Sequence, residues 1–230
     1  MTSTHQQRVV IAIDGPAGAG KSTIAKRLAQ RLGFTYIDTG AMYRVVALWG
    51  LRQNVAMTDM HRMEQLAIAA DIDLAPGRIS LNGEDVTEAI RTPEASSGAS
   101  QVAVIPGVRR AMVAKQREIG QHTNVVMEGR DIGTVVFPDA NVKIYLDDDP
   151  GERARRRAEE MRAKGENPDL RALAAQMRER DQRDSTRADS PLAQAPDAIY
   201  LDSTGLSLDE VEEAILKIVR NRITNGKDFS

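Results

Sequence analysis

The pattern of hydrophobic and polar positions predicts strands that alternate with helices. Residues 9–13 form a β-branched run with a turn signal directly after it, which is typical of a buried strand. Apolar residues then recur at helical spacing over 24–32, and Gly33 stands where a helix would stop. Further strands are expected at 34–37, 124–127, 142–146 and 198–201. Because strands and helices alternate, the expected fold class is α/β, with a parallel sheet flanked by helices.

The middle of the chain departs from this alternation. Helices are expected to begin near Ala41 and to span 59–70. From 71 to 92, the pairs Pro76-Gly77 and Asn82-Gly83 separate short apolar segments, which predicts a small β hairpin or meander. We interpret this region as part of an inserted lobe.

The last third of the chain is rich in charge. The stretch 151–187 contains ten arginines and predicts two helices that are broken near 165–168. Ser207 and Glu210 have the spacing of a capping box, which predicts the start of a terminal helix.

Composition narrows the function classes. The 230 residues are 41% hydrophobic and 28% charged, which suits a globular α/β domain with an insertion or a small accessory lobe. The formal net charge is only −2, so no overall field attracts the chain to a nucleic acid polymer or an anionic membrane. There is no cysteine, which excludes disulfides and thiolate metal sites, and the three histidines are scattered.

Targeting signals are also missing from the sequence. The first eight residues are polar and lack the apolar centre of a signal peptide. No stretch approaches the roughly 20 apolar residues that span a bilayer. We therefore expect a cytoplasmic protein with no membrane partner, and a monomer is the default expectation.

A phosphate-binding motif follows the first predicted strand. The pattern G-x-x-x-x-G-K-[ST] matches residues 15–22 at every fixed position, with a strand before it and an amphipathic helix after it. Backbone N–H groups of such a loop point at phosphate oxygens, and the helix N-terminus adds positive charge. Lys21 would bind the β- and γ-phosphates, and the Ser22 hydroxyl would bind Mg²⁺. A simple glycine-rich turn is the disfavoured alternative, because motif and context agree. The expected ATP-binding residues are Gly15, Pro16, Ala17, Gly18, Ala19, Gly20, Lys21, Ser22, Thr23 and Arg156.

A second oxygen ligand for the metal is expected at the end of another strand. The apolar run 125–127 ends in Glu128, and a carboxylate in that place binds Mg²⁺ in many phosphate-loop proteins, directly or through water. A purely structural role for Glu128 remains an alternative, because strands often end in glutamate.

One candidate cluster for the phosphoryl acceptor lies at 38–44, where the second strand ends and a helix begins. Thr39 suits the N-cap of that helix, and this is its alternative role. Arg44, one turn into the helix, would offer two parallel donors to a second phosphate.

Another candidate cluster is Glu128-Gly129-Arg130-Asp131. Parallel sheets bind ligands at the carboxyl edge of their strands, and this segment falls there. As the alternative, Arg130 and Asp131 would pair only with each other.

The third candidate cluster is arginine-rich. Arg180, Asp184 and Arg187 have the spacing of one helical face, and Arg153, Arg156 and Arg157 repeat the pattern upstream. Such a run is usually a solvated face with ion pairs. Arginine is nevertheless used almost throughout, and transfer between two anions requires several planar cations. A mobile helix pair that closes over the phosphates would also exclude water.

Together these segments resemble the bacterial cytidylate kinase family over about residues 9–220. The resemblance rests on IAIDGPAGAGKS at 11–22, DTGAMYR at 38–44, SQV at 100–102, EGRDIGTVVFP at 128–138 and RDQRDSTR at 180–187. It implies a P-loop nucleoside monophosphate kinase fold that transfers the γ-phosphate of ATP to CMP or dCMP with Mg²⁺. It also implies a core at about 9–58, 104–150 and 188–222, an acceptor-binding insert at about 59–103 and a lid at about 151–187.

The resemblance assigns roles by position. Thr39, Arg44, Arg130 and Arg187 would surround the acceptor phosphate, while Arg180 and Asp184 would reach the ribose. Ser100, Arg109 and Asp131 would contact cytosine, with Tyr43 nearby and Gly129 in the same segment. Charge neutralisation during transfer is expected from Lys21, Arg130, Arg157 and Arg187. Some relatives carry Ser in place of Thr39 and Asp in place of Glu128, and both exchanges keep the functional group.

Other readings of the phosphate loop stay open at this point. The nearest is another small-molecule kinase that acts on UMP, AMP or a non-nucleotide acceptor. A nucleotide-dependent switch is less favoured, because the sequence has no Asn-Lys-x-Asp segment of the kind that reads guanine.

Overall fold

The structure is a computed structural model that describes residues 8–163 and 165–224. The absence of a signal peptide was predicted mainly from residues 1–7, which lie outside the described residues, as does the end of the tail after 224.

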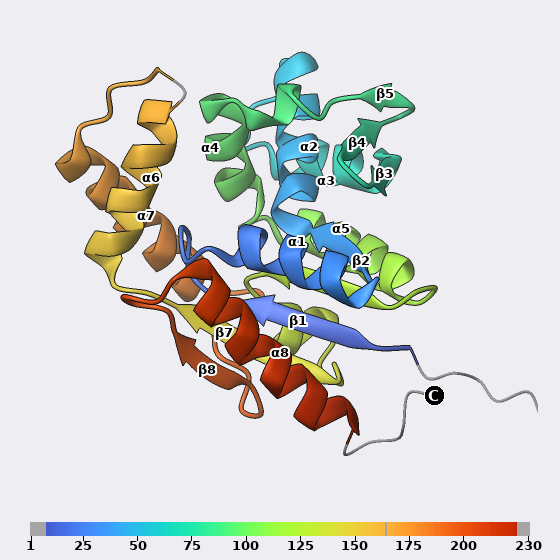
Figure 1. The fold of residues 1–230 in the computed structure, drawn as a ribbon. Helices are drawn as coiled ribbons and strands as arrows, with labels where there is room; N and C mark the ends of the chain where they lie inside the picture. The colour runs from blue at the N-terminus through green and yellow to red at the C-terminus, as the bar shows by residue number, and fades with distance from the viewer. Residues whose placement is uncertain (1–7, 164, 225–230) are drawn as a thin grey trace, which may run out of the picture.

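A five-stranded parallel sheet forms the centre of the molecule, in the order β2-β6-β1-β7-β8 (Figure 1). β1 lies in the middle of the sheet, with every residue buried, as its β-branched sequence predicts. Each predicted strand is confirmed; β7 begins where it was predicted, and the other four begin one residue later. The strands are β1 (Val10–Asp14), β2 (Thr35–Asp38), β6 (Val125–Gly129), β7 (Val142–Asp147) and β8 (Ile199–Asp202).

Helices cover both faces of this sheet. On one face, Ile11 and Ile13 of β1 pack against α1 (Lys21–Leu32) and α8 (Leu208–Thr224). On the other face, Val10 and Ala12 pack against α5 (Pro106–Gly120) and the segment after β6. Alternate residues of one strand therefore enter two separate cores, which is the arrangement expected of a buried parallel strand.

An inserted lobe lies beside α2 (Thr39–Arg52). It contains α3 (Met60–Ala69), the 3₁₀ turn Ala89–Arg91, α4 (Pro93–Val102) and a separate three-stranded sheet. The antiparallel strands are β3 (Ile72–Ala75), β4 (Arg78–Leu81) and β5 (Glu84–Asp85), so the predicted meander is confirmed. Asn82 and Gly83 both have positive φ, at 51° and 83°, as the tight turn between β4 and β5 requires.

The arginine-rich stretch forms two helices side by side, α6 (Pro150–Ala163) and α7 (Leu170–Thr186), at the end of the sheet toward which β1 points (Figure 1). The predicted break near 165–168 falls between them. At the start of α8, the Ser207 N–H donates to Glu210 Oε2 at 2.9 Å and the Glu210 N–H donates to Ser207 Oγ at 3.3 Å. The predicted capping box is thus confirmed.

Sequence patterns did not predict three elements. α4 has few large apolar residues, because it packs closely on α2: a Cβ on Gly98 would lie 3.0 Å from the Cβ of Ala47. α5 was also missed, although Pro106 marks its first turn. Ile132–Val136 has the composition of a strand but forms a short π-helix directly after β6. Within the described residues, no helix is both long and apolar enough to cross a membrane.

Candidate nucleotide site

The phosphate loop joins β1 to α1 under tight steric constraint. Gly15, Gly18 and Gly20 have φ of 149°, 79° and 83°, a region that favours glycine. A Cβ on Gly15 would lie 1.9 Å from the carbonyl oxygen of Leu146, and one on Gly18 would lie 2.7 Å from Cε of Met177. The glycines therefore let the loop pass close to β7 and α7. No side chain caps the N-terminus of α1, which leaves its backbone donors to an anion.

Lys21 is buried at the first position of α1. Its Nζ donates to the carbonyl of Pro16 at 2.6 Å, so the side chain folds back along the loop. Burial, followed by the positive charge of Arg130, lowers the pKa of Lys21 to about 7, while Glu128 opposes the shift. An added negative ligand would restore the ordinary lysine charge.

Glu128 lies beside Ser22 and Tyr36 at the carboxyl end of β6. The Tyr36 hydroxyl donates to Glu128 Oε1 at 2.6 Å. Burial and the charge of Asp38 raise the pKa of Glu128, whereas Lys21 and the Ser22 hydroxyl lower it. Tyr36 was missed by sequence reasoning, because a tyrosine inside a strand is an ordinary core residue.

The neighbouring oxygens of Ser22 and Glu128 fit a magnesium ion. Mg²⁺ keeps several waters and takes one or two protein oxygens together with substrate phosphates, so a hydroxyl and one carboxylate are a suitable donor set. Over the described part of the chain, no three His, Cys, Asp or Glu side chains gather into a metal-binding group.

Thr39 does not cap α2, which was the alternative role considered for it. Asp38 is the N-cap of α2, because its Oδ1 accepts from the Ala41 N–H at 2.9 Å. Thr39 is the first helical residue, and its hydroxyl donates to the backbone carbonyl of Glu128 at 2.7 Å. The N-cap alternative for Thr39 is therefore wrong, and this side chain instead joins the two strand ends. Arg44 pairs with Asp38 Oδ2 at 2.8 Å.

Arg130 and Asp131 do not pair with each other, so that alternative is wrong. Nε of Arg130 donates to Asp184 Oδ2 at 3.0 Å. Asp131 forms a short ion pair with Arg109 of α5, and the side chains are 8% and 3% exposed respectively. The adjacent residues Arg130 and Asp131 thus contact different helices, α7 and α5 respectively.

Tyr43 lies beside Arg109, whereas the buried Ser100 contacts α7. The Arg109 guanidinium lies over the Tyr43 ring, 5.7 Å from its centroid. Ser100 Oγ accepts from Nη1 of Arg183 at 2.9 Å, which joins α4 to α7. Arg183 was missed as a site residue, although it falls within the arginine-rich motif.

The arginine-rich face is only partly helical. α7 ends at Thr186, so Arg187 lies just beyond the helix rather than on its face. It still reaches Asp184 at 3.8 Å and Asp131 at 3.6 Å. Burial and the charge of Arg130 lower the pKa of Arg180 to about 10. Among the described residues, the buried guanidinium nitrogens without a hydrogen-bond partner are Arg109 Nε, Arg180 Nε and Arg187 Nη2.

The upstream arginines divide into buried and exposed groups. Buried Arg153 donates to the carbonyl of Ala17 at 2.7 Å and pairs with Asp181 at 2.5 Å. Asp181 also accepts from the Ala17 N–H at 3.0 Å, so α6 and α7 both contact the phosphate loop. Arg153 was named in the arginine-rich candidate cluster but was given no role, and Asp181 was missed. Arg156 forms a short ion pair with Asp148, which is fully buried.

Arg157 is exposed and pairs with Glu160 at 2.9 Å. The solvated-face alternative therefore describes this side chain, which the structure does not bring to the buried cluster. It lies instead at a cavity of about 300 Å³ that it shares with Arg44 and Asp38.

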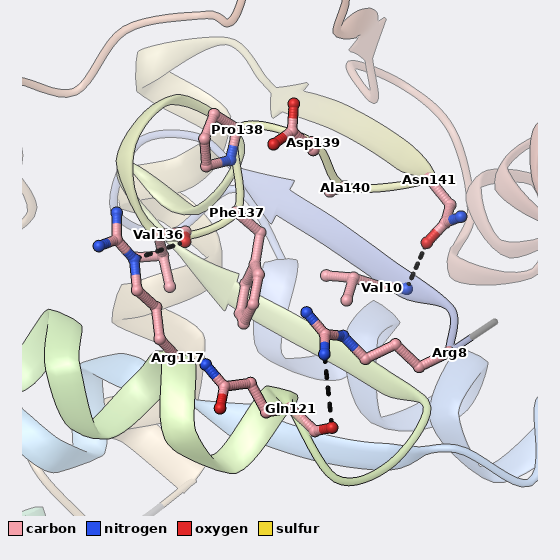
Figure 2. A pocket seen from close by; sticks show the side chains of 10 residues that line it. All are labelled: Arg8, Val10, Arg117, Gln121, Val136, Phe137, Pro138, Asp139, Ala140 and Asn141. Atoms are coloured by element: carbon pink, nitrogen blue, oxygen red, sulfur yellow. Dashed lines mark hydrogen bonds between the residues drawn. The ribbon is translucent and has the colours of Figure 1, made fainter. Parts of the chain in front are cut away.

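A larger cavity, of about 680 Å³, contains none of the predicted site residues (Figure 2). It lies between the end of α5 and the segment that leads into β7. Asn141 closes one side, where its Oδ1 accepts from the Val10 N–H at 2.8 Å. Arg117 closes another, where it donates to the backbone of the π-helix.

Comparison of the sequence and the structure with known proteins identifies the family of this chain. The cytidylate kinase family model matches residues 11–221. A cytidylate kinase of Solibacter usitatus (strain Ellin6076) is 75% identical over the full length of both chains. One of Caldanaerobacter subterraneus subsp. tengcongensis is 50% identical over 95% of this chain and 97% of its own. The crystal structure of an uncharacterised protein from Eubacterium ventriosum ATCC 27560 has a TM-score of 0.52 at 14% identity, covers 92% and 98% of the two chains, and shows the fold alone.

The fold is that of the P-loop nucleoside monophosphate kinases, with the site at the carboxyl edge of a parallel sheet. Together, the family match and the full-length identity show that the chain belongs to the cytidylate kinase family.

Proposed function

We propose that the protein transfers the γ-phosphate of ATP to CMP or dCMP and releases ADP with CDP or dCDP. The observation that supports this most is the buried ion pair of Arg109 and Asp131 next to the phosphate loop. A buried charge pair costs desolvation free energy, so its presence at a ligand edge favours a recognition role.

Cytosine has the chemistry that this pair can read. It offers an amino donor at N4 and acceptors at N3 and O2. Asp131 would accept from N4, while Arg109 and the Ser100 hydroxyl would donate to the ring acceptors. Uracil has O4 in place of the amino group, so an ionised Asp131 would face a second acceptor. An unmatched buried polar contact of this kind costs about 1–3 kcal/mol, which is enough to discriminate the two bases.

The acceptor phosphate and ribose would lie among the other buried charges. Buried donors without a hydrogen-bond partner are unfavourable, so a phosphate oxygen that accepts from Nη2 of Arg187 and a ribose hydroxyl that accepts from Nε of Arg180 would stabilise the cluster. We assign Thr39, Arg44, Arg130 and Arg187 to the phosphate, and Arg180 with Asp184 to the ribose hydroxyls.

The donor would lie on the phosphate loop, with Lys21 at its β- and γ-phosphates and Thr23 and Arg156 at its edge. Ser22 and Glu128 would hold Mg²⁺, Glu128 directly or through water. When bound, the ion supplies positive charge to the triphosphate.

Transfer would be direct and in line. The acceptor oxygen is already an anion, so no residue needs to act as a strong general base. Lys21, Arg130 and Arg187 would position the two nucleotides and neutralise the charge between them. Arg157 would contribute only after its exposed pair with Glu160 opens.

We also propose that the protein acts as a cytoplasmic monomer on small nucleotides. Its nearly neutral overall charge favours local recognition over binding to a polymer or a membrane surface.

An ADP-release assay across CMP, dCMP, UMP, AMP and GMP tests the reaction. We expect turnover with CMP and dCMP to exceed turnover with the other acceptors by at least about tenfold, as the cost of an unmatched base contact implies. Equal rates with UMP would contradict the base assignment. ATP hydrolysis that is as fast without an acceptor as with CMP would contradict the kinase assignment altogether.

A further inference from the structure

Asp14 is a buried carboxylate that the reaction does not use directly. It is the last residue of β1, immediately before the phosphate loop, and it is only 5% exposed. Its side chain reaches the segment after β6: Oδ1 accepts from the Ile132 N–H and Oδ2 from the Gly133 N–H, both at 2.8 Å. One side chain thereby joins the end of β1, which leads into the phosphate loop, to the segment that follows Asp131.

The two amides that Asp14 binds come directly after Asp131. They are the first N–H groups of the π-helix, which have no partner within that helix. The structure records no local side-chain cap there, and the backbone of Asp131 is outside the helical region, at φ −148° and ψ 23°. The conformation at Asp131 therefore depends on a contact from a distant part of the chain.

Forming this contact requires the carboxylate of Asp14 to be buried, which disfavours its charged form. Burial raises the pKa of Asp14 to about 6, and the two backbone hydrogen bonds only partly oppose that shift. A buried carboxylate is costly unless its hydrogen bonds are satisfied. Space is also reserved for it: a Cβ on Gly133 would lie 3.4 Å from Asp14 Oδ2 and 3.1 Å from the Lys143 side chain.

The far end of the π-helix is held from another element. Arg117 of α5 donates to the carbonyls of Val135 at 2.6 Å and Val136 at 3.0 Å, the second of which Figure 2 shows. The same helix α5 carries Arg109, the ion-pair partner of Asp131. α5 thus carries the ion-pair partner of Asp131 and holds the far end of the π-helix. Asp14 holds the end of the π-helix next to Asp131.

We propose that Asp14 is a positioning residue for the acceptor base. By binding the amides of Ile132 and Gly133, it sets where the Asp131 carboxylate lies against Arg109, and so determines discrimination between cytosine and uracil. This inference rests on the proposed function, because it concerns the same base-reading pair.

The variant Asp14→Asn tests the inference. Asparagine has nearly the same size but only one acceptor oxygen, and its NH₂ group would face an N–H donor. We expect KM for CMP to rise by about tenfold and the CMP-to-UMP ratio of kcat/KM to fall by a similar factor, the scale of one lost buried hydrogen bond. KM for ATP should change less than about twofold, because the loop backbone that binds phosphates is kept.

Asp202→Asn is the matched control. Asp202 also ends a parallel strand and accepts a backbone N–H, from Thr204 at 2.9 Å, but it is exposed on the edge strand β8. The control should keep both KM values and the base preference. Equal increases in KM for ATP and CMP in Asp14→Asn, or an unchanged base preference, would overturn the inference.

Hydrogen exchange in the wild-type protein provides a second measurement if Asp14→Asn does not fold. The amides of Ile132 and Gly133 should be as protected as those of β1, and CMP should slow them further. Exchange as fast as in the exposed loops would overturn the inference. Wild-type protein that does not phosphorylate CMP would instead overturn the proposed function, so the two failures are distinguishable.

Discussion

At the scale of single residues, the site is a group of buried charges whose partners come from different elements. Arg109 pairs with Asp131, Arg130 with Asp184, and Lys21 lies among Arg130, Glu128 and Asp14. Burial raises the pKa of Asp14 and Glu128, whereas the guanidinium groups around Asp184 outweigh burial and lower its pKa. The protonation states of these side chains therefore respond strongly to a charged ligand.

Lys21 should take up a proton when ATP binds. With a pKa of about 7 in the free protein, most Lys21 side chains are neutral at pH 8, and the triphosphate will raise that pKa again. We expect uptake approaching one proton at pH 8, measured by calorimetry in buffers of different ionisation enthalpy. Lys21→Met should show none; the same uptake in that variant would place the proton elsewhere.

Asp131→Asn should weaken or reverse the preference for cytosine. The amide can donate to O4 of uracil, whereas the carboxylate cannot, so the CMP-to-UMP ratio of kcat/KM should fall by about tenfold or more. Loss of the Arg109 ion pair will also lower stability. The ratio is measured on one preparation and does not depend on the folded fraction. An unchanged ratio would contradict the role of Asp131 in base recognition.

At the scale of elements, the ends of strands and helices set the geometry of the site. β1 passes into the phosphate loop, β6 into the segment that carries Arg130 and Asp131, and β2 into α2. Side-chain caps then fix where each helix begins, as Asp38 does for α2 and Ser207 does for α8. Helix caps far from the proposed nucleotide site should affect the folding free energy without affecting catalysis.

Ser207→Ala should cost about 1 kcal/mol of folding free energy, because it removes the acceptor for the Glu210 N–H. For a chain of this size the expected fall in Tm is about 2–4 °C, measured by thermal unfolding. Glu210→Gln retains an acceptor for the Ser207 N–H and should cost less. Both variants should keep wild-type KM values, since α8 carries none of the side chains that we assign to the two nucleotides. An unaltered Tm for Ser207→Ala would mean that the cap contributes no stability.

At the scale of the whole molecule, α4 of the inserted lobe and the helix pair α6 and α7 meet beside the proposed acceptor site. α4 of the inserted lobe contacts α7 through Ser100 and Arg183, and α7 contacts the segment directly after β6 through Asp184 and Arg130. α6 and α7 also contact the phosphate loop through Arg153 and Asp181. The two substrates should therefore order different parts of the molecule.

CMP should slow hydrogen exchange in both α4 and α7, because its site uses side chains from each. ATP alone should slow exchange in the phosphate loop and the adjoining turns of α6 and α7, and should leave α4 unchanged. Exchange measured by mass spectrometry tests both expectations. Protection by CMP that is confined to α4 would show that α6 and α7 do not take part in acceptor binding.

Local patterns predicted much of the fold. The strands, the glycine-rich turn between β1 and α1, the break between α6 and α7 and the capping box depend on residues close together in sequence, and each is confirmed. α4 was missed because its small residues serve close packing on α2. The π-helix was missed because Ile132–Val136 has a strand-like composition, whereas contacts from the distant residues Asp14 and Arg117 help to hold it in another shape.

The sequence by itself determined the glycine-rich turn after β1, the positions of the five strands of the main sheet along the chain, and the motifs that resemble one kinase family. Only the tertiary structure decided which charges meet: Arg130 with Asp184, 54 residues away, and Asp14 with Ile132, 118 residues away. The physical reason is that a strand or a loop follows from nearby side chains. The partner of a buried charge depends instead on which strand ends the folded sheet brings together.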